Sequence, residues 1–225
     1  MNQVLGARGA AGYVLGRGAG SASANWWEAG GATGIVAAYQ PKGAASLAAS
    51  YTNLANPGTY NASPGVAPTW AAATGWTFNG STQYLTAGIV LFGGWTVLLR
   101  FSSATLGTTA NIFGASPDAT NRFRFGPRTA GIIYVFGAGV ATVAPAITSG
   151  VIGMAGSQPY RNGVADGSAL AAWTGSGSIV AFIGAFNSAG TPSGYQAANV
   201  QALAIYSATL TGAQVAAVTA AMNLL

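Results

Sequence analysis

The chain has 225 residues, of which 51% are hydrophobic and 5% are charged, and its formal net charge is +5. It has no cysteine and no histidine, which excludes disulfides and removes the commonest zinc ligands and the usual general base near neutral pH. The length and the hydrophobic content suit one domain with a sizeable core. Eight basic and three acidic residues are few for a freely soluble surface, so we expect neighbouring molecules to cover part of it.

The first part of the chain, residues 1–33, is rich in Gly and Ala and lacks both the helical and the strand period. It is interpreted as an N-terminal arm ahead of a folded domain over residues 34–225. Two interpretations stay open: a flexible leader, or an arm that becomes ordered when it docks onto a neighbouring subunit. In the second case the contacts would come from Arg8, Tyr13, Arg17, Trp26 and Trp27.

Neither end of the chain predicts export or a membrane span. The N-terminus lacks the unbroken apolar core of a signal peptide. Residues 167–225 carry no charged side chain, but Gly, Ser, Thr, Asn and Pro interrupt them too often for a transmembrane helix.

From Gly34 onward, short apolar or alternating runs are separated by turn residues, a spacing typical of an all-β sandwich or barrel. Residues 95–101 alternate between two faces, with Leu98 as the exception, and residues 122–125 alternate Arg with Phe. Further strands are predicted at residues 132–136, 179–183 and 200–206. Asn79-Gly80 and Asn162-Gly163 predict two tight hairpins, because a type I′ turn needs positive φ at both central residues.

The C-terminus predicts one short helix. Thr211 and Gln214 can form a capping box, and Leu210 can pack as a staple onto Val215. The apolar residues that recur on one helical face are Val215, Val218, Met222 and Leu225. We expect this helix to cover one edge of the sandwich.

Four segments, at residues 34–39, 76–84, 160–164 and 200–218, match in order the pattern of a known family. They include Phe78-Asn-Gly, Tyr160-Arg-Asn-Gly-Val164 and Ile205-Tyr followed by Leu210-Thr. This pattern resembles concanavalin A-like domains of the laminin G type over residues 34–225. The resemblance implies an all-β, two-sheet antiparallel jelly-roll sandwich. Many calcium-binding members place aspartates and asparagines at one rim, whereas here only Asp118 and Asp166 remain, each in a turn sequence, so no metal or cofactor is predicted.

The sequence offers little conventional catalytic chemistry. Glycoside hydrolases of this sandwich use two carboxylates, but the only glutamate, Glu28, lies in the arm and no two carboxylates share a short strand. Serines without histidine lack the usual triad base. The prediction is therefore that the chain is not an enzyme and has no catalytic residues.

Two sets of side chains are candidates for binding. The first would decorate the outer face of neighbouring strands, either as a solvated face or as a cationic patch against a capsid shell or an anionic glycan: Arg100, Arg122, Arg124 and Arg128. Nucleic acid is not predicted, because so few arginines neutralise only a handful of phosphates. The second set consists of loop tyrosines that could stack on sugars, Tyr51, Tyr60 and Tyr195, whereas Trp70 and Trp173 are assigned to packing.

The first hypothesis on function is a non-enzymatic structural protein at the surface of a bacteriophage virion, as a capsid decoration or a tail or fibre component. Its partners would be other virion proteins or copies of itself in a homo-oligomeric assembly. The alternative is a glycan-binding adhesin or lectin module, extracellular or at a cell surface, that recognises host carbohydrate. A third hypothesis is an inactive relative of the hydrolases with an empty groove.

Overall fold

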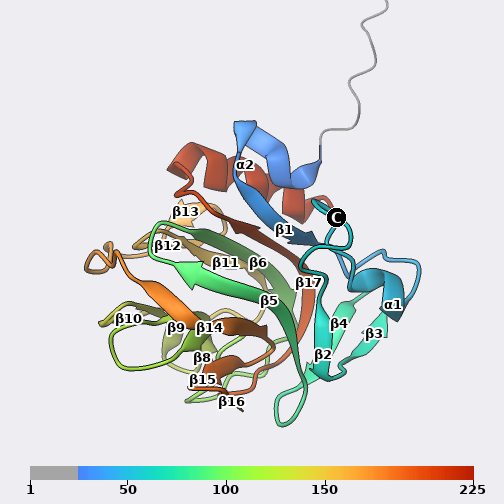
Figure 1. The fold of residues 1–225 in the computed structure, drawn as a ribbon, viewed down its shortest axis with the longest axis horizontal. Coiled ribbons are helices and arrows are strands. Elements are labelled where there is room, and N and C mark those ends of the chain that lie inside the picture. Colours follow the sequence, from blue (N-terminus) through green and yellow to red (C-terminus); the bar gives the residue numbers. More distant parts are fainter. Residues whose placement is uncertain (1–24) are drawn as a thin grey trace, which may run out of the picture.

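Two β-sheets packed face to face make up most of the structure, a computed structural model that describes residues 25–225 (Figure 1). The strands pair antiparallel, apart from a short parallel pairing of β15 with β7 and an isolated parallel bridge. A short helix ends the chain. The predicted fold class, an all-β two-sheet sandwich with a C-terminal helix, is confirmed. No helix among residues 25–225 has the length and apolar character that a membrane span needs.

Sheet A has the strand order β13-β12-β11-β6-β17-β4-β3, with β1 also paired to β17. Its strands are β1 (Ile35–Tyr39), β3 (Thr69–Ala71), β4 (Gly75–Asn79), β6 (Thr96–Ser102), β11 (Gly150–Ala155), β12 (Gln158–Arg161), β13 (Val164–Ala165) and β17 (Ala197–Tyr206). Three helices accompany the sheets: η1 (Trp26–Gly31, a 3-10 helix), α1 (Leu47–Ser50) and α2 (Gly212–Asn223).

Sheet B has the strand order β10-β9-β8-β7-β14-β5-β2, and the hairpin of β15 and β16 continues it beside β7. Its strands are β2 (Ser63–Val66), β5 (Tyr84–Phe92), β7 (Phe113–Ser116), β8 (Phe123–Arg128), β9 (Gly131–Phe136), β10 (Gly139–Val143), β14 (Ser176–Ile183), β15 (Phe186–Ser188) and β16 (Thr191–Ser193).

The core between the sheets is rich in aromatic rings, and each buried ring removes a large apolar area from water. The fully buried ones include Trp76, Tyr39, Tyr134, Phe101, Phe113, Phe123, Phe125 and Phe136. Both phenylalanines of β8 point inward and its arginines outward, as their alternation predicts.

A second apolar cluster lies on the outer face of sheet A, where α2 packs against β6, β11 and β13 and buried residues of β17 join the cluster. Leu98 of β6 points into this cluster, which explains why it breaks the alternation of that strand. The predicted capping box of Thr211 and Gln214 is present, and Val215, Val218 and Met222 are buried. The expectation that the helix covers an edge is wrong, because α2 covers a sheet face.

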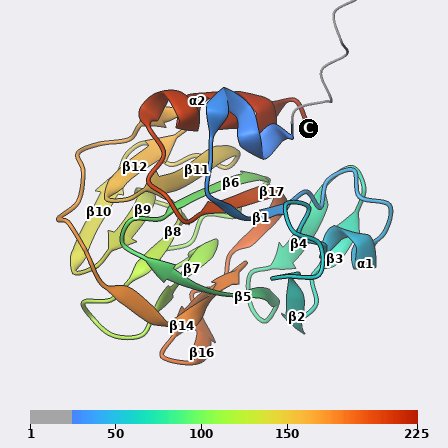
Figure 2. The same cartoon turned by 45° about the horizontal axis from the view of Figure 1, so that its top comes forward.

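The helix η1 lies beside α2 in both views (Figures 1 and 2). Trp26 and Trp27 are buried there, and the Tyr206 hydroxyl donates a hydrogen bond of 2.7 Å to the Trp27 carbonyl. These two tryptophans therefore belong to the folded body rather than to a free arm, which moves the boundary at residue 34 towards the N-terminus. Arg8, Tyr13 and Arg17 lie outside the described residues.

The two Asn-Gly pairs have different roles. Asn162 and Gly163 both have positive φ and join β12 to β13, as the hairpin prediction requires. The prediction is wrong at Asn79, because β4 and the following β5 belong to different sheets. There the Asn79 Oδ1 accepts the backbone N–H groups of the next turn, Ser81, Thr82 and Gln83, and carries the chain from sheet A to sheet B.

Candidate functional site: an aromatic row beside a hydroxyl-lined hollow

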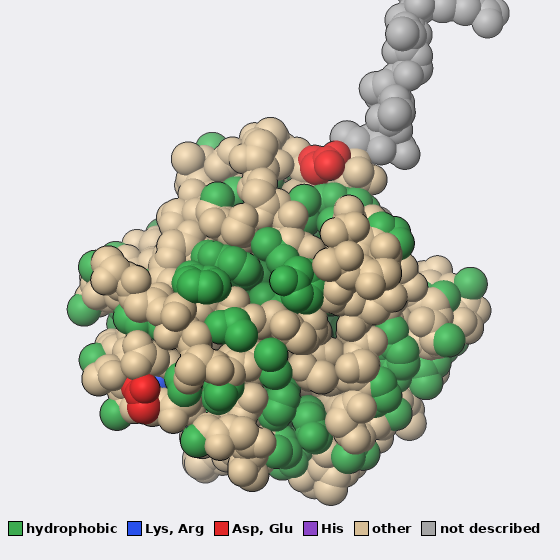
Figure 3. Space-filling model, in the orientation of Figure 1, with side chains coloured by type: hydrophobic (Ala, Val, Ile, Leu, Met, Phe, Trp, Pro, Cys, Tyr) green, Lys and Arg blue, Asp and Glu red, His purple; other side chains and the backbone are tan. Residues whose placement is uncertain are grey.

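The outer face of sheet B is accessible along β5. Residues of β5 alternate between fully buried inward side chains and partly or fully exposed outward ones. Hydrophobic side chains gather over β5 and β14 on the face shown in Figure 3, which presents almost no Lys or Arg. An exposed apolar surface next to polar residues is typical of a ligand-binding face.

Aromatic rings follow this face from one end of β5 to the other. Tyr84 packs on Phe182 of β14 with ring centroids 4.6 Å apart and approaches Tyr195 at 6.5 Å. At the far end Phe92 lies 5.4 Å from Trp95. Between them, a Cβ built at Gly88 would lie 4.0 Å from the Tyr60 ring, so Tyr60 covers the middle of the strand. The aromatic row is defined as Tyr60, Tyr84, Phe92, Trp95 and Tyr195, of which Trp95 is partly buried and also packs against the core.

Tyr60 is held in an unusual conformation. Its φ is 54°, in the left-handed region that L-residues other than Gly, Asn and Asp rarely adopt, and its side chain is 45% exposed. The buried Tyr39 hydroxyl donates a hydrogen bond to the Tyr60 carbonyl. A strained residue that is also exposed gains nothing from burial, and such positions concentrate at functional sites.

A buried asparagine fixes the loop that presents this ring. Asn53 is completely buried, and its Oδ1 accepts the N–H groups of Ala38 at 2.9 Å and Ala55 at 3.1 Å. Its amide group donates to the carbonyls of Val36 at 3.0 Å and Thr59 at 2.9 Å. Since Thr59 directly precedes the strained tyrosine, this network fixes the backbone on one side of it.

A hollow of about 420 Å³ lies at the Tyr195 end of the row. It is lined by Asn79, Gly80, Tyr195, Ala197 and the loop of residues 105–110. The lining hydroxyls of Thr105, Thr108, Thr109 and Tyr195 make no hydrogen bond to another described residue. The volume falls in the range of small-ligand sites, about 300–1,000 Å³. The site therefore offers unused hydroxyls next to an aromatic ring.

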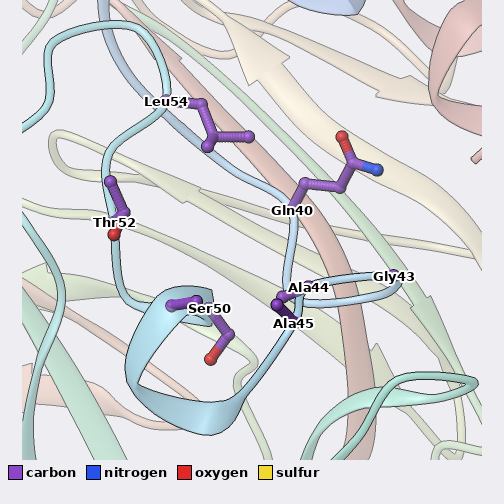
Figure 4. A pocket seen from close by; sticks show the side chains of 8 residues that line it. Gln40, Gly43, Ala44, Ala45, Ser50, Thr52 and Leu54 are labelled. Atoms are coloured by element: carbon purple, nitrogen blue, oxygen red, sulfur yellow. The ribbon is translucent and has the colours of Figure 1, made fainter.

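Two other hollows are less suited to a polar ligand. The hollow of about 280 Å³ beside α1 has no aromatic ring in its lining (Figure 4), and its Ser50 hydroxyl is already bonded to Trp76 and Leu47. The hollow of about 350 Å³ beside Trp173 contains a ring, but that ring packs edge-on against Phe136 and donates to Asn121.

The structure separates the three predicted sugar-stacking tyrosines. Tyr60 and Tyr195 lie in the aromatic row, whereas Tyr51 packs against Trp76 of the core with ring centroids 6.0 Å apart. Burial of the Tyr51 hydroxyl raises its pKa. Trp70 and Trp173, assigned to packing, both lie against the core.

The four arginines predicted on one face do not share it. Arg100 lies on β6 of sheet A, where it donates to the carbonyls of Met222 and Leu225 at 2.8 Å and so binds the end of α2. Arg122, Arg124 and Arg128 lie together at β8 of sheet B. The prediction assigned Arg100 wrongly because alternation gives the face of a strand but not the sheet to which the strand belongs.

The chain's three carboxylates are involved in local structure. Asp118 accepts hydrogen bonds from Asn121 and Thr120, which hold its pKa well below its usual range. Asp166 pairs with Arg161 at 2.8 Å, and Glu28 accepts from Asn25 at 3.1 Å. Residues 25–225 gather no group of three acidic or metal-ligating side chains.

Sequence reasoning missed several residues of this site, namely Tyr84, Phe92, Trp95, Thr105, Thr108 and Thr109. The outward alternation of residues 84–92 could have identified Tyr84 and Phe92 as exposed residues of one strand. The threonines carry no such signal, because a loop hydroxyl has the same sequence pattern whether it lines a hollow or faces open solvent.

Comparison with known proteins finds solved structures that share the fold of this chain. No family model matches the sequence, and no curated protein matches it. A mutant of Trypanosoma rangeli sialidase with trans-sialidase activity is similar over 85% of this chain and 33% of its own, with 16% identity and a TM-score of 0.54. Domain 4 of AbnA, a GH43 extracellular arabinanase from Geobacillus stearothermophilus, is similar over 82% of this chain and 98% of its own, with 15% identity and a TM-score of 0.53.

The fold is one found in glycoside hydrolases. The sialidase of Trypanosoma rangeli in complex with 2,3-difluorosialic acid gives a TM-score of 0.55 at 14% identity, again over 33% of its length. The chain thus spans about a third of the sialidases and nearly all of the arabinanase domain. At these identities the likeness establishes the fold.

These neighbours contradict the prediction that the chain is not an enzyme, because they are sialidases and a domain of an arabinanase. The prediction rested on the absence of a carboxylate pair and of histidine. Counting carboxylates is a poor criterion for this group, since sialidases use a tyrosine as nucleophile. Absence of a carboxylate pair therefore does not separate this chain from glycoside hydrolases.

Proposed function

We propose that this chain is a glycan-binding module and that its site is the hollow beside Tyr195 together with the aromatic row. One observation carries the proposal: Tyr195 and three threonine hydroxyls without a protein partner line the same hollow. A sugar needs both, because its apolar C–H face stacks on an aromatic ring while its hydroxyl groups need hydrogen-bond partners.

The aromatic row extends the proposed site beyond one sugar. Residues 84 to 92 of a strand span roughly 26 Å, at about 3.3 Å per residue, so the row offers stacking positions for several successive rings of an oligosaccharide. The strained conformation of Tyr60 would place its ring where it can stack on one of these sugars. The other end of the row, at Phe92 and Trp95, would contact a longer chain only.

Two further observations support the proposal. The arabinanase domain that shares this fold is described in complex with arabinotriose. The four segments that resemble laminin G-type, concanavalin A-like domains favour a module that binds rather than one that only fills space. A role at a virion surface stays a prediction that no described contact tests, and glycan binding is compatible with it.

The proposal is tested by calorimetric titration of the purified chain with arabinotriose and with a panel of neutral and acidic oligosaccharides. We expect at least one oligosaccharide to bind and Tyr195→Ala to weaken it about tenfold, which corresponds to about 1.4 kcal/mol. Thr108→Val and Thr109→Val, which keep the shape and remove a hydroxyl, should weaken it by a few fold without lowering the melting temperature.

Val140→Ala is the matched control, because Val140 is an exposed apolar residue on β10 at the opposite edge of sheet B. It should leave the affinity unchanged. An oligosaccharide that binds Tyr195→Ala as tightly as the unmodified chain would contradict the proposed site.

A further inference from the structure

Three arginines on the outer side of sheet B lack an acidic partner. The arginine cluster is defined as Arg124 and Arg128 of β8 together with Arg122, which directly precedes that strand. The one ion pair among residues 25–225 is Arg161 with Asp166, elsewhere in the fold. The cluster's hydrogen-bond acceptors are neutral: the carbonyls of Gly137, Ala138, Thr109 and Ala110 and the side chain of Asn111.

The positive charges of the cluster act on one another. Burial, together with the smaller effects of the positive charges of Arg128 and Arg122, lowers the pKa of Arg124 to about 10. Burial also lowers the pKa of Arg128. Partly buried like charges without a counterion oppose folding, so the cluster is better explained by an anion that it binds than by stability.

The cluster borders the proposed glycan site on two sides. Arg124, Gly114 of β7 and Phe182 of β14 face one another across neighbouring strands, and Phe182 contacts Tyr84 of the aromatic row. Arg124 and Phe182 are therefore two strand spacings apart, a distance of about 10 Å. Gly114 makes room for Arg124, because a Cβ there would lie 2.3 Å from the Arg124 Cβ.

A second connection runs through Phe186. The Arg124 guanidinium lies over the Phe186 ring, 4.3 Å from its centroid, and a Cβ built at Gly194 would lie 2.9 Å from the same ring. Gly194 directly precedes Tyr195. Arg128 meanwhile donates to the carbonyls of Thr109 and Ala110, two residues that line the hollow.

The cluster keeps donors for a ligand. The Arg124 Nη2 and the Arg128 Nη1 have no acceptor among residues 25–225, and the single bond of Arg124 Nη1 is long, 3.4 Å to Asn111. A carboxylate or sulfate accepts such guanidinium donors in charge-assisted pairs, which are about twice as strong as neutral ones.

We infer that the ligand of this site is an acidic glycan, whose neutral ring stacks on Tyr195 while its carboxylate or sulfate group is bound by Arg124 and Arg128. This inference rests on the proposed function and names the class of glycan. The arginine cluster, which has no acidic partner, is the reason to expect a negatively charged ligand. The hollow and the aromatic row are the reason to expect that this ligand is a glycan.

Matched neutral and acidic ligands test the inference on the full chain. Lactose, 3′-sialyllactose and lactose 3′-sulfate share the lactose unit, to which the second adds a sialic acid residue and the third a sulfate group, and tetragalacturonate carries carboxylates where its methyl ester carries neutral ester groups. We expect each bound acidic ligand to exceed its neutral partner in affinity at least tenfold at low salt, with the ratio falling as salt rises. The three acidic ligands distinguish a sialic acid, a uronic acid and a sulfate as the source of the charge.

Single substitutions separate the preference for an acidic ligand from glycan binding itself. Arg124→Gln should reduce acidic-ligand affinity at least fivefold and leave neutral-ligand affinity unchanged, whereas Tyr195→Ala should reduce both. Lys42→Gln removes the same charge near the end of α2, where Lys42 donates to the Leu225 carbonyl, and should leave the acid preference unchanged. Thermal unfolding verifies that each variant is folded.

Equal binding of neutral and acidic partners would overturn the acidic-glycan inference while the proposed function stands. The same holds if Arg124→Gln weakens both ligand types equally. If no member of either set binds and no neutral oligosaccharide of the earlier panel binds, both the proposed function and this inference fail.

Discussion

Tyr60 is a single residue whose backbone conformation lowers the stability of the fold while its ring is held at the surface. Its left-handed backbone costs roughly 1–2 kcal/mol for an L-residue, and a glycine would avoid this cost. We therefore predict that Tyr60→Gly is more stable than Tyr60→Ala by about 1 kcal/mol, although glycine ordinarily destabilises a folded chain relative to alanine. Urea unfolding of both variants measures the difference, and both should lose the same affinity for an oligosaccharide. An alanine variant as stable as the glycine variant would show that the backbone is not strained.

At this scale the sequence identifies residue types better than residue roles. Tyr51, Tyr60 and Tyr195 look alike in sequence, as large rings next to turn residues. The structure separates them because Tyr51 follows α1 directly and packs inward on Trp76, while Tyr60 continues the loop fixed by Asn53. Which way a loop ring points depends on contacts with residues far away in the chain, and no local pattern contains them.

At the scale of elements, α2 is held to the sandwich at its end as well as along its face. The last carbonyls of a helix lack partners within the helix, and Arg100 supplies a charge-assisted donor to one of them, that of Met222, and another to Leu225 just beyond the helix. We predict that Arg100→Met, which keeps the apolar stem, lowers the free energy of unfolding by about 2 kcal/mol. Lys42→Met, which loses one bond to Leu225, should cost about half as much. Denaturant unfolding of the two variants measures this, and equal stability of Arg100→Met and the unmodified chain would refute it.

Some elements can be predicted from short sequence motifs alone. The capping box of α2 and the hairpin at Asn162-Gly163 depend on residues within a few positions of one another, and both are as predicted. Asn79-Gly80 has the same local signal but connects two sheets, because the strands on either side pair with distant segments. A turn motif determines how the chain bends, whereas the strand that follows it pairs according to the packing of the whole sandwich.

At the scale of the whole molecule, the separation of the arginines follows from strand order. β6 and β8 are close in sequence, but β6 lies in the middle of sheet A between β11 and β17, whereas β8 lies in sheet B between β7 and β9. Alternation correctly places Arg100 and Arg124 on outward faces, yet these faces lie on opposite sides of the sandwich. The fold class could be predicted from the sequence because it depends on periodicity, whereas the site could not because it depends on strand order.

Three buried tyrosines make the whole fold sensitive to alkali. Burial raises the pKa values of Tyr39, Tyr134 and Tyr206, and their hydroxyls donate to Tyr60, Asp166 and Trp27 respectively. The unfolded chain loses these protons above pH 10, the ordinary value for tyrosine, while the folded chain keeps them. The stability that the protonated hydroxyls contribute is therefore fully present below pH 10 and is lost as pH rises above it. Arg124 acts in the opposite direction, because its lowered pKa of about 10 makes the folded chain release a proton before the unfolded chain does.

The balance of these groups predicts a measurable slope. Each tyrosine contributes a limiting loss of about 1.4 kcal/mol per pH unit well above pH 10, and Arg124 offsets about one of the three, so the free energy of unfolding should fall by about 2 kcal/mol between pH 10 and pH 11. Urea unfolding between pH 9 and pH 11 measures this fall, and Tyr206→Phe should reduce it by about 1 kcal/mol between pH 10 and pH 11, because the variant has no proton to keep at that position. Absorbance of tyrosinate near 295 nm should rise together with unfolding rather than before it for these three residues. A stability independent of pH over this range, or the same slope in Tyr206→Phe, would show that the buried hydroxyls ionise without opening the sandwich.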